Sequence, residues 1–444
     1  MRKVIGLVFL VLAMHATSAV AQQVVAGPMP GHSAMRAVQV WLQTDAPAEL
    51  RLAYRPAGSD GEFGVSEAVV TDEAFAFAAE VDVTGLEPGT VYEYRVLVDG
   101  RAQAFDQPLR FQTQPLWQWR EDPPDFSFAL GSCSYVNDAP YDRPGRPYGG
   151  DYQIFDAIAR TEPDFMLWLG DNVYYREVDW DHPWAMVQRF SHTRQLPEMQ
   201  RLLRATHHFA TWDDHDYGPN NADRSYALRD TAKDVFDAFW PNPPFSGSGG
   251  GGVMTYFEWH DAGFFLLDNR FFRSANDRVS GARTVLGAGQ IQWLIDALRK
   301  SDATFKFVVM GGQFINSAET GENYINLAPG ERREILDRLA AEDIPGVVFL
   351  TGDRHHSVLL RKGRRGGYPL YDWTVSPLTA GAGTPREGEG QYRVGGSLFT
   401  DRNFGRVELS GPRDDRVATL ILHDSDGEEQ FRYTLRANEL RSGR

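Results

Sequence analysis

Hydrophobic and polar positions alternate along the segment from about Val24 to Pro115. Short apolar runs such as 37–42 and 49–54 are interrupted there by Pro, Gly and Asp. A two-residue period places apolar side chains on one face of a strand, and no helical period competes with it. This pattern therefore predicts a small all-β sandwich over residues 24–115. The stretch Gln114–Pro124 contains two Trp and three Pro and would form the linker that follows.

The pattern changes after residue 125, where strand-like apolar runs alternate with amphipathic stretches of three- and four-residue spacing. We expect strands at 126–130, 165–169, 264–267, 305–310, 347–350, 404–409, 417–423 and 431–435. Helices are expected at 152–160, 185–205, 230–240, 289–300 and 330–341. Strands that alternate with helices predict an α/β domain, which we place at residues 125–437.

Length and charge narrow the class of protein. A chain of 444 residues with 42% hydrophobic and 24% charged residues is long enough for one small and one large domain. Its 45 basic and 60 acidic residues give a net charge of -15, which argues against specific nucleic-acid binding and against an anionic membrane surface as partner. An acidic protein can still bind a phosphate group where a cation sets the local field.

The first 21 residues have the pattern of a cleavable export signal. Arg2 and Lys3 precede an apolar run over 4–14, and the small-residue pattern Ala19-Val20-Ala21 offers a cleavage site before Gln22. The run is too short to span a bilayer, and no later stretch reaches 18 uninterrupted apolar residues. We therefore expect a periplasmic or secreted protein without a transmembrane anchor.

Two segments place ligand-type side chains directly after apolar runs, where an α/β sheet exposes its sites. FALGSCSY ends in Cys133, the only cysteine of the chain, which excludes an intramolecular disulfide. DFMLWLGDNVYY brings Asp171 and Tyr174 together at the end of a strand, as a carboxylate and a phenol that can bind cations. Taken singly, a lone Cys is usually a small buried hydrophobe, and Asp in a turn often only hydrogen-bonds locally.

Two further segments are richer in oxygen and imidazole ligands. ATWDDHDYGPNNAD surrounds His215 with three Asp and continues with two Asn, a combination that suits hard cations and a proton donor. In GVVFLTGDRHHS, an extended segment after the strand would turn Asp353 and His355 to the same side and Arg354 away. Adjacent histidines also occur by accident on protein surfaces, so the four segments carry weight only together.

The motifs GSC, LGDNVYY, WDDHDYGPNN, LLDNRFFR, LGAGQIQWL and LTGDRHHS follow one another in this order between about residues 125 and 410. In this order they resemble the PhoD-like alkaline phosphatases of the calcineurin-like metallophosphoesterase superfamily. The stretch 84–96 similarly resembles a corner of a fibronectin type III domain, and members of the phosphatase family carry a small sandwich there. The resemblance implies a four-layer α/β/β/α fold with a site that holds Fe(III) and Ca(II).

The resemblance also implies a role for each matched residue. The Fe(III) ligands would be Cys133, Asp171, Tyr174 and His355, with Asp171 bridging to the second metal. Asp353 and Asn220 would bind Ca(II), and the Asp213/Asp214 pair belongs to the same shell. Which of the two aspartates ligates stays open, as does Asn221 in place of Asn220. His215 would contact the substrate, and Arg176 and Arg354 are candidate phosphate contacts by their proximity.

By this resemblance the chain would hydrolyse phosphate monoesters, diesters or both, with a metal-activated hydroxide as nucleophile. Its partners would be small-molecule phosphate esters. A phospholipase-like phosphodiesterase acting on phospholipid is the alternative, because the motifs define the metals and not the pocket for the second ester group. A non-catalytic exported binding module is a weaker alternative, since a decayed enzyme would be expected to lose one of the four segments.

Overall fold

The computed structural model describes residues 22–245, 251–318 and 321–442. The expected export signal at 1–21 and most of the SGSGGGG tract lie outside the described residues. Within the described ranges, no helix has the length and apolar character needed to cross a bilayer.

The N-terminal part is a β-sandwich, as its alternating pattern predicts. One sheet has the order β1-β2-β6, and the other is built around β3 and β7 with short flanking strands. Their bounds are β1 Val24–Ser33, β2 Ala37–Thr44, β3 Glu49–Pro56, β4 Gly64–Val65, β5 Val69–Val70, β6 Ala78–Thr84, β7 Val91–Val98, β8 Arg101–Ala102 and β9 Arg110–Gln112. Val40, Leu52 and Val96 are fully buried between the sheets, because alternate side chains of each strand face inward.

Two six-stranded mixed sheets form the larger part of the molecule. The first has the order β12-β11-β10-β19-β20-β21 and the second β13-β14-β15-β16-β18-β17. The strands of the first sheet are β10 Phe126–Gly131, β11 Phe165–Leu169, β12 His207–Thr211, β19 Asn403–Ser410, β20 Val417–Asp424 and β21 Glu429–Arg436. Those of the second are β13 Thr255–Trp259, β14 Ala262–Leu266, β15 Phe305–Met310, β16 Val347–Thr351, β17 Val358–Arg364 and β18 Gly367–Thr374.

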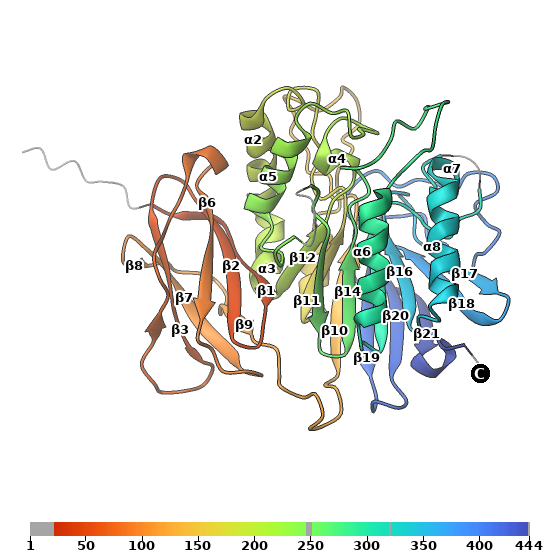
Figure 1. Ribbon diagram of the computed structural model, residues 1–444. Helices are drawn as coiled ribbons and strands as arrows, with labels where there is room; N and C mark the ends of the chain where they lie inside the picture. The colour runs from red at the N-terminus through yellow and green to blue at the C-terminus, as the bar shows by residue number, and fades with distance from the viewer. Residues whose placement is uncertain (1–21, 246–250, 319–320, 443–444) are drawn as a thin grey trace, which may run out of the picture.

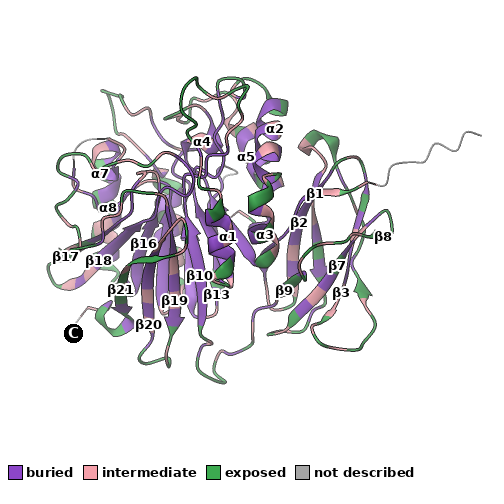
Figure 2. Ribbon diagram, turned by 180° about the vertical axis from the view of Figure 1, so that it is seen from behind, coloured by how far each residue is buried: buried purple, intermediate pink, exposed green. Residues whose placement is uncertain are grey.

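The expected four-layer α/β/β/α arrangement is confirmed. Helices α6 (Gly287–Lys300) and α8 (Pro329–Ala341) lie in front of the sheets in Figure 1, and α1 (Gln153–Arg160) lies on the other side in Figure 2. The sheets face each other across a core of aromatic side chains. Phe165 of the first sheet stacks at 5.0 Å on Phe128 and meets Phe264 of the second sheet edge-on at 5.2 Å.

The prediction of a single helix over 185–205 is wrong. The chain forms α2 over Pro183–Arg194 and α3 over Pro197–Ala205, with Gln195 and Leu196 between them. Leu196 is extended, with ψ of 120°, because a residue that precedes proline is disfavoured in the helical region. Pro197 lacks a backbone N–H and occupies the first turn of α3, where no donor is needed.

The sandwich packs against the α/β part through buried polar contacts as well as apolar ones. The His207 Nε2 atom accepts from the Gln112 backbone N–H at 3.1 Å, so its Nδ1 donates to the Gly31 carbonyl at 2.8 Å. Trp41 of β2 donates to the Ala238 carbonyl of α5 (Arg229–Phe239) at 2.9 Å. Because these bonds join strands of the sandwich to the larger sheet and its helices, the two parts form a continuous structure.

Candidate metal centre

The candidate ligands lie where parallel strands of both sheets end. Strands β10, β11 and β12 run parallel, as do β14, β15 and β16, so their carboxyl ends lie on one edge of the molecule. Cys133, Asp171, Asp213 and Asp353 each follow the last residue of such a strand by two positions. The motifs that were adjacent to apolar runs in sequence are therefore brought together in space.

Four of the candidate ligands have a left-handed backbone. The φ angles are 58° at Cys133, 52° at Asp171, 70° at Asp353 and 54° at His355. The prediction that Asp353 and His355 share one side of an extended segment is therefore wrong in its reason, because the chain turns sharply after β16. Both side chains nevertheless point to the cluster, Asp353 toward Asp171 and Asp213, and His355 toward Cys133 and Asp171.

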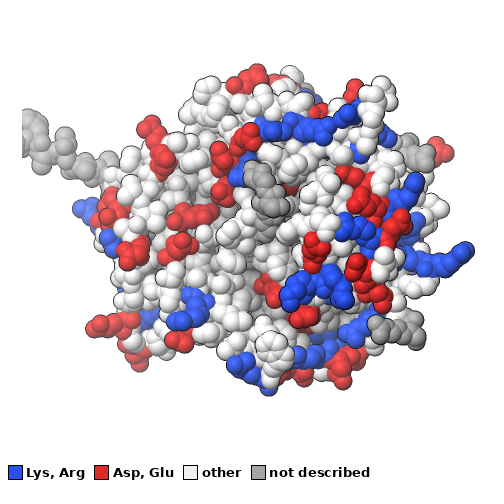
Figure 3. Space-filling model, viewed as in Figure 1, with Lys and Arg blue, Asp and Glu red and all other residues white. Residues whose placement is uncertain are grey.

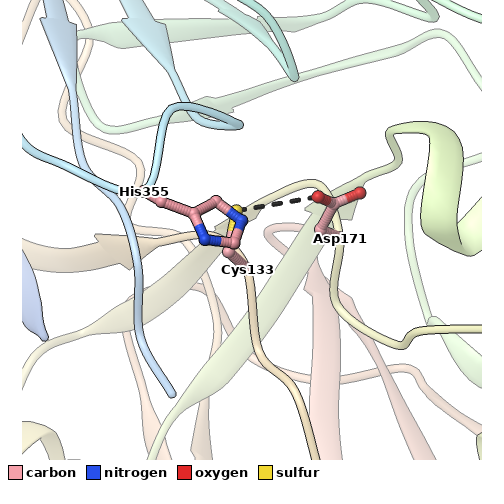
Figure 4. Close-up of side chains that lie close together, drawn as sticks. All are labelled: Cys133, Asp171 and His355. Carbon is pink, nitrogen blue, oxygen red and sulfur yellow. Dashed lines mark hydrogen bonds between the residues drawn. The ribbon is translucent and has the colours of Figure 1, made fainter. Parts of the chain in front are cut away.

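Asp171 is the shared member of three groups whose ligand atoms lie within 4.8 Å of one another. The groups are Cys133 with Asp171 and His355, Asp171 with Asp214 and His215, and Asp171 with Asp213 and Asp353. Figure 4 shows the side chains of the first group pointing toward one another. The Cys133 Sγ atom lies 3.6 Å from Asp171 Oδ2, and the Tyr174 hydroxyl lies 3.3 Å from that oxygen.

Asp213 and Asp214, which follow β12 of the first sheet, are held by a buried arginine that follows β14 of the second sheet and that sequence reasoning missed. Arg270 donates from Nε to Asp213 Oδ1 at 2.5 Å and pairs with Glu322 at 2.9 Å and Asp214 at 3.7 Å. The other Asp213 oxygen, Asp353 Oδ2 and His215 Nδ1 are buried without a hydrogen-bond partner among the described residues. Buried polar atoms are rarely left unpaired in a folded protein, so these three atoms are candidates to bind a ligand.

Burial dominates the pKa shifts of the cluster. It raises the pKa of the Cys133 thiol to about 12 and that of Asp353 to about 7. Burial, and then repulsion by Asp214 and Cys133, raise the pKa of Asp171 well above its ordinary value. Burial also opposes the charge of Asp214, but Arg270 and His215 outweigh it and lower the Asp214 pKa. Burial lowers the pKa of His215, so its ring is neutral near pH 7.

These residues fit bound cations. The cluster gathers several carboxylates and a thiol, and Arg270 and Arg354 neutralise only part of the charge that these groups would carry. Oxygen atoms of Asp213 and Asp353 are buried there without a hydrogen bond among the described residues. A cation would supply the missing charge and favour the deprotonated forms. Thiolate, phenolate and imidazole on one side suit a transition metal, whereas the carboxylates on the other side suit a hard cation.

The His355 ring is oriented by contacts that the sequence did not reveal. Its Nδ1 atom lies 2.5 Å from the Gly381 carbonyl, which fixes the proton there and leaves Nε2 free as an acceptor toward the cluster. The Ser376 hydroxyl lies 3.2 Å from Cys133 Sγ and accepts from the His355 backbone N–H. The Tyr148 hydroxyl lies 3.2 Å from the same His355 Nδ1.

A hollow of about 510 Å³ opens beside the cluster. Tyr174, His215, Asn220 and Arg176 line it, and the ring centroids of Tyr174 and His215 are 4.3 Å apart. The Asn221 side chain instead lies against Glu322 and Asn276, so Asn220 is the asparagine on this wall.

Arg354 is not among the residues that line this hollow. It pairs with Glu389 and lies 3.6 Å from Asp353.

A sequence model described as PhoD-like phosphatase matches residues 128–392, which is more than half of the chain. The chain belongs to the PhoD-like phosphatase family. A second model, a domain of unknown function (DUF7800), matches residues 21–115. The recognition made from the six motifs is thereby confirmed.

Known relatives resemble this PhoD-like chain at low sequence identity. Alkaline phosphatase D of Bacillus subtilis (strain 168) is 24% identical over an alignment of 337 residues, and the match covers 64% of this chain and 54% of the relative. The chain thus spans about half the length of that curated relative. A solved structure of PhoD superposes with a TM-score of 0.75 at 17% identity and covers 93% of this chain and 90% of its own.

A purple acid phosphatase from yellow lupin (Lupinus luteus) seeds superposes with a TM-score of 0.68 at 11% identity. That match covers 94% of this chain and 74% of the lupin chain. Both solved structures establish the fold of the PhoD-like chain.

Proposed function

We propose that this PhoD-like chain is an exported, metal-dependent phosphoesterase that hydrolyses phosphate monoesters, diesters or both. The observation that carries the proposal is the sharing of Asp171 among three ligand groups, since a carboxylate between two such groups can bridge two cations. Family membership supports the reaction class. The buried oxygens of Asp213 and Asp353 that accept no hydrogen bond among the described residues support cation binding at this position.

For the metals, the proposal is Fe(III) at Cys133, Asp171, Tyr174 and His355, and Ca(II) at Asp353, Asn220 and the Asp213/Asp214 pair. The soft thiolate, the phenolate and the imidazole favour iron on the first side, and oxygen ligands alone favour calcium on the second. Bound there, the cations would acidify a water molecule and neutralise charge on the phosphoryl oxygens.

The residues of the hollow would bind and orient the ester. Arg176 would donate hydrogen bonds to phosphate oxygens, since its Nε atom is buried without a partner among the described residues. The neutral His215 ring would donate a hydrogen bond or proton to the leaving oxygen from its place beside Tyr174. Arg354 remains a predicted phosphate contact, from the Asp353 side of the centre.

The proposal is tested with two substrates, 4-nitrophenyl phosphate and bis(4-nitrophenyl) phosphate. Their hydrolysis is measured after the protein is treated with a chelator and again after calcium is restored. We expect calcium-dependent turnover, and the monoester to diester ratio chooses between phosphatase and phosphodiesterase. Asp171→Asn should reduce kcat by more than about 100-fold and lower the metal content, because a shared ligand is lost. Asp60→Asn, at an exposed carboxylate of the sandwich, is the matched control and should behave as the parent.

Two further measurements separate the parts of the proposal. An Fe(III) phenolate and thiolate centre should be coloured, and Tyr174→Phe and Cys133→Ser should remove the absorption band. Sequencing of the mature N-terminus should give Gln22 if residues 1–21 are removed on export. Metal-loaded protein that hydrolyses neither ester would refute the enzymatic proposal.

A further inference from the structure

The hollow beside the candidate metal centre has a wall of arginine and aromatic side chains. Arg143, Arg146 and Tyr148 come from the loop between β10 and α1, and Arg176 and Trp180 come from the segment after β11. Tyr135 completes the wall, at 5.0 Å from both the Tyr148 and the Tyr174 ring centroids.

Three arginines at one opening stand out in a chain with a net charge of -15. Figure 3 shows acidic and basic side chains interspersed over the face that it presents, so single-sign clusters are not the rule on this surface. Positive charge around a cleft attracts anionic ligands and favours their capture. The arginines of the wall therefore indicate that the hollow binds an anionic ligand.

These arginines are incompletely neutralised by the protein. Glu177 is the carboxylate beside both Arg143, at 2.8 Å, and Arg176, at 3.2 Å, so one negative charge serves two guanidinium groups. Within the described ranges, no carboxylate lies within ion-pairing distance of Arg146. The remaining acid of the wall, Asp142, accepts from the Tyr135 hydroxyl at 2.5 Å and from the Asp138 backbone at 2.8 Å.

The scissile phosphate alone does not use all of this charge. Arg176 has a side chain only 8% exposed, and it lies on the wall with Tyr174 and His215, close to the candidate metals. Arg143 and Arg146 are exposed and belong to the loop that forms the outer part of the wall. A substrate that fills the hollow from the centre outward would bring its leaving group to these two side chains.

We propose that the hollow accepts phosphate esters whose leaving group is flat and carries its own negative charge, which Arg143 and Arg146 bind. Tyr135, Tyr148 and Trp180 would pack against the flat group. This inference rests on the proposed phosphoesterase function and names the substrate class of that site. Arg143 and Arg146 are thus specificity-determining residues, and the hydrolytic step is that of the proposed function.

The test compares two isosteric esters on the metal-loaded enzyme, 4-carboxyphenyl phosphate and 4-carbamoylphenyl phosphate. They differ in the charge of the distal group, and the carbamoyl compound has the better leaving phenol. We expect kcat/KM to favour the carboxylate by roughly five- to tenfold at low salt, since each exposed charge pair contributes little by itself. The preference should shrink at 0.5 M NaCl, a condition in which exposed charges are screened.

Arg146→Gln should lower the ratio of kcat/KM for the carboxylate ester to kcat/KM for the carbamoyl ester by roughly threefold, and Arg146→Lys should lower it less. The double substitution Arg143→Gln with Arg146→Gln should bring this ratio to about one. Arg365→Gln removes the same charge at an exposed position of the β17–β18 turn and should leave the ratio unchanged. A parent ratio near one, or a ratio that survives the double substitution, would overturn this inference alone. Failure to hydrolyse either ester would overturn the proposed function together with it.

Discussion

Replacing Gly170 by alanine should destabilise the protein and weaken its metal centre together. Gly170 has φ of +102°, and a Cβ atom there would lie 2.9 Å from the Asp213 Cβ atom and 3.0 Å from the Asp213 backbone nitrogen. The backbone conformation costs an alanine about 1–2 kcal/mol. Overpacking against the Asp213 backbone adds about 1–3 kcal/mol, because backbone cannot move aside as a flexible side chain does. We expect a total loss of about 2–5 kcal/mol in the free energy of unfolding.

Gly85→Ala is the matched control. Gly85 has φ of +75°, and nothing lies within 4 Å of the added Cβ atom. This variant should lose only the conformational part, about 1–2 kcal/mol, and should keep its metal content.

Urea unfolding in the presence of a chelator measures the first effect, and elemental analysis with calcium titration measures the second. Gly170→Ala should shift Asp213 and bind calcium more weakly. Equal losses of stability in the two variants would refute the reasoning, because the close approach to Asp213 would then contribute nothing. Full metal content in Gly170→Ala would show that Asp213 need not hold its present position.

Three other substitutions test the core, the buried histidines and the arginine behind the centre. Phe165→Ala should cost about 3–5 kcal/mol in the free energy of unfolding, whereas Trp119→Ala, at a side chain that is 91% exposed, should change it by less than about 0.5 kcal/mol. Burial lowers the pKa of His208 to about 3, so the unfolded chain binds a proton between pH 6.5 and 3 that the folded chain does not, and stability falls as the pH falls. At about 1.4 kcal/mol per pKa unit the loss is roughly 5 kcal/mol, and His208→Gln, which keeps a donor and an acceptor, should unfold in acid with a shallower dependence on pH. Arg270→Gln should cost about 3–5 kcal/mol in metal-free protein, because Asp213 loses its counter-charge and Glu322 keeps only Arg273. Calcium should reduce that deficit, and an equal deficit with and without calcium would show that Arg270 and the cation do not neutralise the same charges.

Strands buried on both faces were the easiest elements to predict, whereas β12, β17 and β18 were missed. The run over 165–169 has five buried residues without a polar one, and it forms β11 as expected. β12 has the sequence HHFAT and was not predicted, because its two histidines interrupt the apolar pattern. Both histidines are nevertheless buried and hydrogen-bonded. β17 and β18 were missed for the same reason, since charged and glycine residues interrupt their apolar pattern.

The approach of three candidate ligands to one another could be predicted because each follows a strand closely in sequence. Cys133, Asp171 and Asp353 stand at strand ends, and parallel strands bring such ends together. The groups around them could not be predicted in this way. Arg270 and Glu322 meet across 52 residues of sequence, and the Gly381 carbonyl reaches His355 from a loop that carries no motif.

The left-handed turns at the cluster indicate that the conformational free energy of arranging the ligands is spent during folding and not during metal binding. A non-glycine residue in this conformation costs on the order of 1 kcal/mol or more, and persists only where its surroundings hold it. Here the turns hold one another: the Cys133 and Ser134 N–H groups donate to the carbonyls of Gly170 and Asp171, and Gly383 donates to His355. The first two bonds tie the loops after β10 and β11 together, and the third ties the loop after β16 to the segment after β18. The Ala380 N–H, which donates to the Cys133 carbonyl at 3.0 Å, joins the two pairs across the sheets. The backbone therefore adopts these strained conformations when the sheets fold, and a cation would enter a centre whose backbone is already arranged.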